Sequence, residues 1–302
     1  MKILNFGSLN LDYVYRLEHF VQPGETISAS EQALNPGGKG LNQSIALARA
    51  GAKVYHAGCI GSEGEMLRKL LRENAADDKF LHTVDTMQGK AIIQLTPSGE
   101  NSIILFGGSN QAVTRTQVDE TLDNFSMGDY LILQNEINEL PYIVEKAYEK
   151  GMVIVLNPSP FNERLDAVDF NKISWFIVNE IEAEQLSGEK EAEKVWQKVH
   201  EKYPAVSMVI TLGSAGSVAF KNVNGSIERA EQPSFNVKAV DTTAAGDTYT
   251  GYFVNGITSG KTLREAMKTA SAAAAISVTR VGAVPSIPNI DETKIWMERY
   301  AN

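Results

Sequence analysis

The sequence predicts an α/β fold: an open, mainly parallel sheet with helices on both faces, plus a small β-sheet that forms a lid. Short apolar runs rich in Val, Ile and Leu alternate with segments of helical pattern. Such runs without polar alternation are typical of buried parallel strands. Strands that alternate with helices favour a sheet covered on both faces. Two stretches that break the alternation predict the small sheet.

The elements follow from these patterns in order along the chain. The predicted strands of the main sheet are 3–6, 54–60, 130–134, 152–156, 175–178 and 208–212. The predicted helices are 41–50, 63–73, 114–122, 137–150, 189–202, 246–258 and 263–279. Residues 12–34 are extended around a Pro23-Gly24 turn. Residues 90–96 and 102–106 flank Pro97-Ser98-Gly99-Glu100, which predicts a hairpin.

We therefore predict an α/β body of residues 1–11, 36–89 and 108–302, and a β-lid of residues 12–35 and 90–107. A small sheet inserted in this way can cover a site and exclude water from it. It can equally be an edge sheet without a role in binding, and periodicity does not separate these two interpretations.

Composition limits the classes of function. The chain has 302 residues, of which 43% are hydrophobic and 22% charged, so a sizeable core is expected. A formal net charge of −9 argues against non-specific nucleic-acid binding. The single cysteine, Cys59, excludes an intrachain disulfide and fits the cytoplasm. No run reaches the roughly 20 apolar residues of a membrane span, and four scattered histidines argue against zinc.

The most informative motif runs from Val240 to Thr248, where an apolar strand pattern gives way to a helix. Ala244, Ala245 and Gly246 are small, so backbone N–H groups there can approach an anion at the positive end of the helix. Asp247 follows directly. Beside a bound phosphoryl group, Asp247 could accept the proton of an attacking hydroxyl. Aspartate also caps helices, and this stretch alone does not decide between base and cap.

A second glycine-rich helix start lies at Gly37-Gly38-Lys39-Gly40, followed by Asn42. It matches neither the P-loop pattern nor G-x-G-x-x-G, so a phosphate cradle is a poor interpretation. Lys39 and Asn42 could instead donate hydrogen bonds to hydroxyl groups. A tight turn with a surface lysine is the alternative.

Two further stretches follow predicted strands. Asn179 and Glu182 offer oxygens after the strand 175–178, which suits Mg²⁺, although acidic residues are common in the first turn of a helix. The glycine turn from Thr211 to Gly216 follows the next strand, where α/β folds bind nucleotides, or it is a plain connection.

Together, in this order, the four motifs resemble the ribokinase-like sugar kinases, the phosphofructokinase-B type, from Gly7 to about Pro288. The octapeptide from Asp241 to Thr248 looks like the second signature of this family and is highly specific for it. The resemblance implies a ribokinase-like fold, a lid that often mediates homodimerisation, and Asp247 as base with Ala244, Ala245 and Gly246 as anion hole. It assigns ATP and Mg²⁺ to Asn179, Glu182, Thr211, Gly213, Gly216, Gly246 and Ser271.

The resemblance also implies the substrate, D-ribose, phosphorylated at its primary hydroxyl to D-ribose 5-phosphate. The implied sugar contacts are Asn10, Asp12, Gly38, Lys39, Asn42, Glu136 and Asp247. This set suits a ribose, which offers only hydroxyl groups. The implied K⁺ loop comprises Asp241, Thr243, Ser277, Arg280, Gly282 and Ser286. An ion pair between Asp241 and Arg280, without any cation, is the alternative.

Three other functions stay open at this point. A sister kinase of the same family could act on another sugar, a sugar phosphate or a nucleoside. A non-catalytic protein could hold ATP or a sugar without turnover, which the intact Asp247 disfavours. A dehydrogenase is disfavoured because Gly7-Ser8-Leu9-Asn10 stands where G-x-G-x-x-G would be expected.

Overall fold

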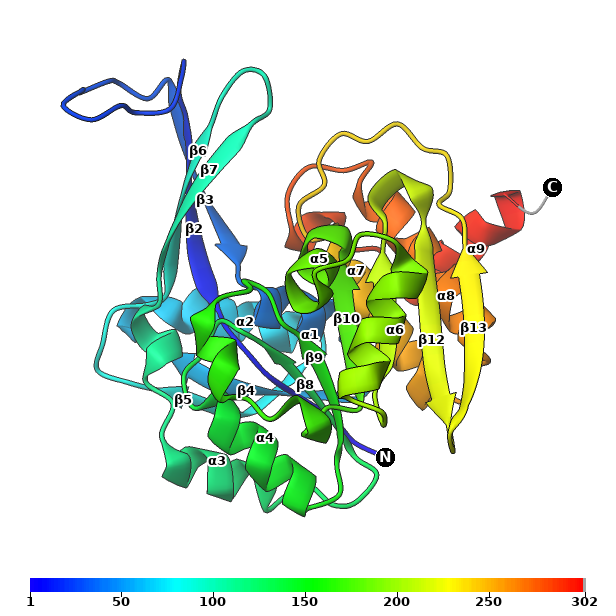
Figure 1. Cartoon of the computed structure of the whole chain (residues 1–302). Helices are drawn as coiled ribbons and strands as arrows, with labels where there is room; N and C mark the ends of the chain where they lie inside the picture. Colours follow the sequence, from blue (N-terminus) through cyan, green and yellow to red (C-terminus); the bar gives the residue numbers. More distant parts are fainter. Residues whose placement is uncertain (301–302) are drawn as a thin grey trace.

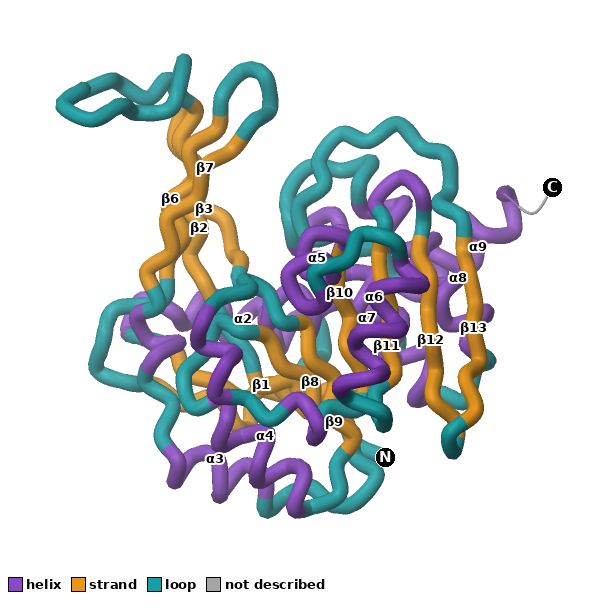
Figure 2. The backbone as a smooth tube through the Cα atoms, in the orientation of Figure 1, coloured by secondary structure: helices purple, strands orange, loops and turns teal. Residues whose placement is uncertain are grey.

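A computed structural model describes residues 1–300, and it contains a nine-stranded sheet at the centre of the body (Figures 1 and 2). The strand order is β13-β12-β11-β10-β9-β8-β1-β4-β5. All neighbouring strands from β11 to β5 are paired in parallel, and β12 pairs antiparallel with both β11 and β13. The strands are β1 (Ile3–Phe6), β4 (Val54–Ile60), β5 (Asp77–Thr83), β8 (Tyr130–Gln134), β9 (Val153–Asn157), β10 (Trp175–Asn179), β11 (Ser207–Thr211), β12 (Ser217–Val223) and β13 (Ser226–Gln232).

Helices cover both faces of this sheet, which confirms the predicted fold class. One apolar core joins the sheet to α3 (Arg115–Leu122), α4 (Leu140–Glu149), α5 (Glu180–Ser187) and α6 (Ala192–Lys202). The other core joins it to α1 (Lys39–Arg49), α2 (Glu65–Glu73), α7 (Ala245–Thr258) and α8 (Leu263–Ser277). The last helix, α9 (Ile290–Tyr300), packs against α8, and its Ile290 contacts this core. Neighbouring strand residues alternate between the cores: Ile132 belongs to one, Leu131 and Leu133 to the other.

A second sheet of four strands projects from the body (Figure 1). Its order is β3 (Glu31–Gly37), β2 (Asn10–Arg16), β6 (Lys90–Leu95) and β7 (Asn101–Phe106). The pair β6 and β7 is the predicted hairpin, and β2 and β3 are antiparallel. All six residues of β7 are exposed, including Ile103, Ile104, Leu105 and Phe106.

Several elements differ from the prediction. The sheet is extended by β5, β12 and β13, and α9 completes the chain. Strands β5 and β13 lie at the sheet edges and are largely polar, so they lack the apolar runs that mark central strands. The predicted helix 189–202 starts at Ala192 and is preceded by a separate helix, α5, which ends at Gly188 in the left-handed conformation.

Helices α1 and α7 lie unusually close together. A Cβ atom added to Gly251 of α7 would come within 2.5 Å of the Ala46 Cβ and 2.8 Å of the Leu47 backbone nitrogen. Only a glycine therefore allows this spacing. Because α1 and α7 both begin at the edge of the sheet where the parallel strands end, their N-termini come together there.

Candidate active site

Asp247 lies in the first turn of α7 and is buried. The N-cap of this helix is Ala244, with φ 60°, and no side chain caps the helix. The carboxylate instead accepts hydrogen bonds from two amides of α1: Asn42 Nδ2 at 3.0 Å and Gln43 Nε2 at 2.9 Å. The capping interpretation of Asp247 is therefore wrong, since its oxygens are held by another helix.

The glycine-rich start of α1 lies against the loop after β1. Gly38, with φ 94°, is the N-cap, and a Cβ on Gly40 would collide with the backbone of Ser8. This contact brings the Lys39 backbone nitrogen within 3.1 Å of Glu136 Oε2, which also accepts a hydrogen bond from Ser8 Oγ. Glu136 follows β8, so three chain segments meet at one carboxylate.

A small cavity of about 220 Å³ lies between these helix starts and the ends of β10 and β11. Its lining includes the side chain of Lys39 and the predicted anion hole; the members are Lys39, Asn157, Ile177, Val178, Asn179, Glu182, Thr211, Thr242, Ala244, Ala245, Gly246, Asp247 and Thr250. Burial opposes the charge of Lys39, but the carboxylates of Asp247, Glu136 and Glu182 outweigh it and raise the Lys39 pKa above its ordinary value. The cavity thus holds a permanent cation and suits an anionic group.

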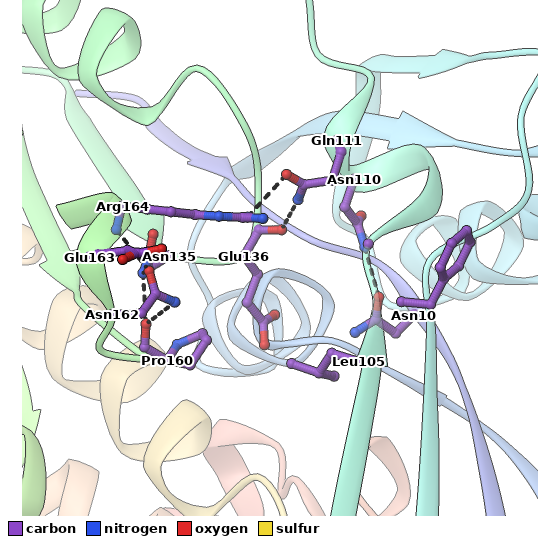
Figure 3. A pocket seen from close by; sticks show the side chains of 12 residues that line it. Asn10, Leu105, Asn110, Gln111, Asn135, Glu136, Pro160, Asn162, Glu163 and Arg164 are labelled. Carbon is purple, nitrogen blue, oxygen red and sulfur yellow. Dashed lines mark hydrogen bonds between the residues drawn. The ribbon is translucent and has the colours of Figure 1, made fainter. Parts of the chain in front are cut away.

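A larger cavity of about 560 Å³ lies beside the second sheet (Figure 3). Its lining is largely polar: Asn10, Leu105, Phe106, Gly107, Asn110, Gln111, Asn135, Glu136, Pro160, Asn162, Glu163 and Arg164. Arg164 donates to Gln111 (3.1 Å), whose Nε2 donates to the Glu136 carbonyl (2.9 Å). Sequence reasoning found Asn10 and Glu136 but missed Gln111, in the turn before α3, and Arg164, in the segment after β9, because no motif marks either residue.

Asp12 of β2 is a carboxylate in an unusual environment. It sits against Gly37, where any Cβ would collide with its carboxyl group, and its Oδ1 is buried without a hydrogen-bond partner in residues 1–300. Burial, together with the charge of Glu136, raises the Asp12 pKa to about 7. The buried Oδ1 atom of Asn42 likewise lacks a partner among the described residues. Buried acceptors of this kind are suited to receive ligand hydroxyl groups.

We expect Asp12→Asn to stabilise the free protein at high pH. Because the folded-state pKa of about 7 exceeds the ordinary 3.8, the native state binds more protons between these pH values, and stability falls as pH rises through that window. Asparagine does not titrate, so the variant avoids this loss of stability at high pH. The Tm difference between Asp12→Asn and wild type should therefore grow between pH 5 and pH 8, at roughly 2–4 °C per kcal/mol. The exposed Asp85→Asn is the control, and a pH-independent difference would contradict the assignment.

The predicted nucleotide residues lie along the ends of β10 and β11. Asn179 caps α5, and Glu182 completes a capping box: Asn179 Oδ1 accepts from Glu182 N (2.8 Å), and Glu182 Oε2 accepts from Asn179 N (3.1 Å). Thr211 ends β11 and lines the small cavity. Gly213 and Gly216 form the turn that follows, and Gly216 has φ 103°. Ser271 is buried in α8 and does not line either cavity.

The two segments of the predicted K⁺ loop also meet. Asp241 accepts hydrogen bonds from Thr243 N (2.9 Å), Thr243 Oγ1 (2.6 Å) and Gly282 N (2.8 Å). Burial pushes the Asp241 pKa up, but these hydrogen bonds outweigh it and lower the pKa below its ordinary value. The alternative ion pair with Arg280 is wrong, because that guanidinium binds Glu292. Ser277 and Ser286 donate to carbonyl groups of their own turns.

The fold and the site define a small-molecule kinase: a carboxylate at a glycine-rich helix start stands at an anion-binding cavity that adjoins a polar one. A model of the pfkB family carbohydrate kinases matches residues 1–290, and the chain belongs to this family. It is 36% identical over 302 residues to a ribokinase of Haemophilus influenzae, with 97% of each chain covered.

Two other proteins extend this comparison. The structure of an Arabidopsis thaliana ribokinase complexed with ribose and ATP matches with a TM-score of 0.85 at 27% identity, covering 98% of both chains. A deoxyribokinase of Salmonella typhi is 28% identical, with 97% of each chain covered.

Proposed function

We propose that this protein transfers the γ-phosphoryl group of ATP to the primary hydroxyl of D-ribose, giving D-ribose 5-phosphate and ADP. The observation that carries the proposal is the Asp247 carboxylate, which two amides hold beside the anion cavity and the charged Lys39. The similarity to ribokinases over nearly the whole chain supports ribose as the sugar.

In this proposal Asp247 is the general base. The hydroxyl O–H bond breaks as the new O–P bond forms, the proton passes to Asp247, and the bond to the β-phosphate oxygen breaks as ADP leaves. The backbone N–H groups of Ala244, Ala245 and Gly246 stand at the positive end of α7 and stabilise negative charge on the transferred group. A Cβ on Gly246 would meet no atom within 4 Å, so this position is open toward a ligand.

The proposed sugar contacts extend from Asp247 into the larger cavity. Asp12 and Asn42 supply buried acceptors without partners in residues 1–300, and Glu136 and Asn10 line the cavity itself. Gly38 and Lys39 complete the set where α1 begins. Such a set distinguishes sugars by their hydroxyl groups, because a missing hydroxyl leaves a buried acceptor unpaired.

We propose that the nucleotide lies along Asn179, Glu182, Thr211, Gly213, Gly216 and Gly246, with Ser271 near the base. The donor set fits a Mg²⁺ that keeps several waters and binds substrate phosphates, since Glu182 and Asp247 both line the small cavity. No group of three or more acidic, His or Cys ligands lies within residues 1–300, so the protein does not enclose the ion. When bound, Mg²⁺ neutralises phosphate charge.

We expect Glu182→Gln to raise the Mg²⁺ concentration for half-maximal activity by about tenfold, which corresponds to ~1.4 kcal/mol. Glutamine preserves the capping box but removes the negative charge. The KM for ribose should change little. Glu180→Gln, on the exposed side of the same helix turn, is the matched control. Equal Mg²⁺ titrations for both variants would remove Glu182 from the metal site.

We also propose a K⁺ ion at the loop of Asp241, Thr243, Ser277, Arg280, Gly282 and Ser286. Its support is that Asp241 and Gly282 are joined next to the anion hole, so that an ion there would fix the backbone before Ala244. Arg280 would contribute its carbonyl, because its guanidinium binds Glu292. Titration with K⁺ in tetramethylammonium buffer should raise kcat in a saturable way, and full activity without K⁺ would refute the site.

The division into the body and the β-lid of residues 12–35 and 90–107 is part of this proposal, as is a cytoplasmic location. The exposed apolar residues of β7 support a homodimer through the lid, which sedimentation equilibrium would test. No helix within residues 1–300 has the length and apolarity to span a membrane.

The function is tested by measuring ADP formation with a panel of sugars, sugar phosphates and nucleosides. Ribose should give the highest kcat/KM. Deoxyribose is the competing candidate, because the Salmonella typhi relative is a deoxyribokinase. If ribose were inert and another substrate were phosphorylated efficiently, that substrate would take the place of ribose in the proposal. If no substrate of the panel were phosphorylated, the result would favour a non-catalytic binding protein.

A further inference from the structure

A continuous chain of hydrogen bonds runs through the core behind Asp247. Gln43, which donates to Asp247, accepts a hydrogen bond through Oε1 from Gln134 Nε2 at 2.7 Å. Gln134 Nε2 also donates to Asn5 Oδ1 at 3.0 Å, and Asn5 Nδ2 donates to Ser44 Oγ at 2.8 Å. Ser44 Oγ lies 2.8 Å from Nδ1 of His56. Gln43, Gln134, Asn5, Ser44 and His56 are all fully buried.

An obligatory acceptor fixes the direction of this chain. Asn5 Nδ2 also donates to the Gly40 carbonyl at 2.8 Å, an atom that can only accept, so the Asn5 oxygen faces Gln134. At the far end, burial lowers the His56 pKa to about 4, so the ring is neutral near pH 7. Gln134 in turn faces Gln43 with its amino group. A flipped Gln43 would place its oxygen against the Asp247 carboxylate and its amino group against the Gln134 amino group.

We infer that Gln134 is a positioning residue for Asp247. It acts through Gln43, whose amide it holds so that the amino group, and not the oxygen, faces the carboxylate. The inference rests on the proposed role of Asp247 as base. Gln134 and Gln43 line neither cavity, so they act on the orientation of the base and not on ligand binding. Preorganised groups of this kind matter most in the transition state.

The test compares two glutamine-to-methionine substitutions of similar size. Gln134→Met removes both donated hydrogen bonds and should lower kcat about tenfold, less than the ~10²-fold that a 1 Å misplacement can cost. The KM for the sugar should stay within about twofold of wild type, the split expected when transition-state stabilisation alone is lost. Gln117→Met is the control, because Gln117 is also buried and donates to Gly58 O but has no link to Asp247. Equal kcat values for the two variants would overturn the inference.

A double-mutant cycle separates the relay from a general loss of stability. In a Gln43→Met background, Gln134→Met should reduce kcat no further, because the connection is already broken. Independent, multiplying effects would overturn the relay. If Gln134→Met does not fold, Gln134→Glu serves instead. Its activity relative to wild type should recover as pH falls and the buried carboxyl becomes a donor, and a pH-independent ratio would count against the relay.

The proposed base is tested separately. Full activity of Asp247→Asn would remove both the base and the relay. An inactive Asp247→Asn together with an unaffected Gln134→Met would remove the relay alone.

Discussion

Replacing Asp247 with asparagine is expected to lower kcat by about 10²–10⁴-fold, the usual contribution of a general base. Asparagine preserves the size of the side chain but cannot accept the hydroxyl proton. It also presents an amino group to Asn42 or Gln43, which both act as donors at this position. The measurement is steady-state kcat and KM for ribose with saturating ATP and Mg²⁺.

Asp129→Asn is the matched control for this substitution. Asp129 is also buried and accepts hydrogen bonds from backbone nitrogens, those of Lys2 (2.7 Å) and Ser126 (3.0 Å), far from the site. We expect it to lower stability and to leave kcat near the wild-type value. If a folded Asp247→Asn protein kept wild-type turnover, another group would have to remove the proton.

The second large effect is expected for Lys39→Met, which should lower kcat by about 10²–10³-fold, as the loss of a preorganised charge typically does. The three carboxylates of Asp247, Glu136 and Glu182 raise the pKa of Lys39, so it is charged throughout the neutral range. Methionine preserves the apolar stem and removes the only lysine or arginine that lines the small cavity within residues 1–300. Negative charge on the transferred phosphoryl group would then face uncompensated carboxylates.

Lys90→Met serves as the control for Lys39→Met. Lys90 begins β6 and pairs with Glu63 at 3.0 Å, outside both cavities. Its loss should leave kcat within about twofold, because isolated pairs near the surface contribute little. A Lys39→Met enzyme with normal kcat and a raised sugar KM would place Lys39 in sugar binding alone.

The sequence predicts the main sheet and the two helix starts because both depend on local pattern. Glycines 38 and 40 mark close backbone approach to the loop after β1. At the helix starts, Asn42 and Asp247 come within 3.0 Å although 205 residues separate them. The apolar runs likewise identify the central strands, whose two faces are both buried.

What could not be predicted depends on contacts between distant segments. Gln134 ends an apolar strand and Asn5 lies within one. Only the order β8-β1-β4, together with the packing of α1 on it, brings them next to Ser44 and His56. Arg164 lies in a short 3-10 helix, Glu163–Ala167, whose position is set by the fold around it. Strand β13 is largely polar and exposed because it lies at the edge of the sheet.

The close contact at Gly251 links the packing of the core to the position of the Asp247 carboxylate. It lies one helical turn beyond Asp247, opposite Ala46, which is one turn beyond Asn42 and Gln43. The size of the side chains at this crossing therefore sets the distance between the Asp247 carboxylate and the amides of Asn42 and Gln43. A bulkier residue there would separate them without touching any ligand. Substitutions in the core at this crossing can therefore change kcat, although the residues that contact the substrates stay the same.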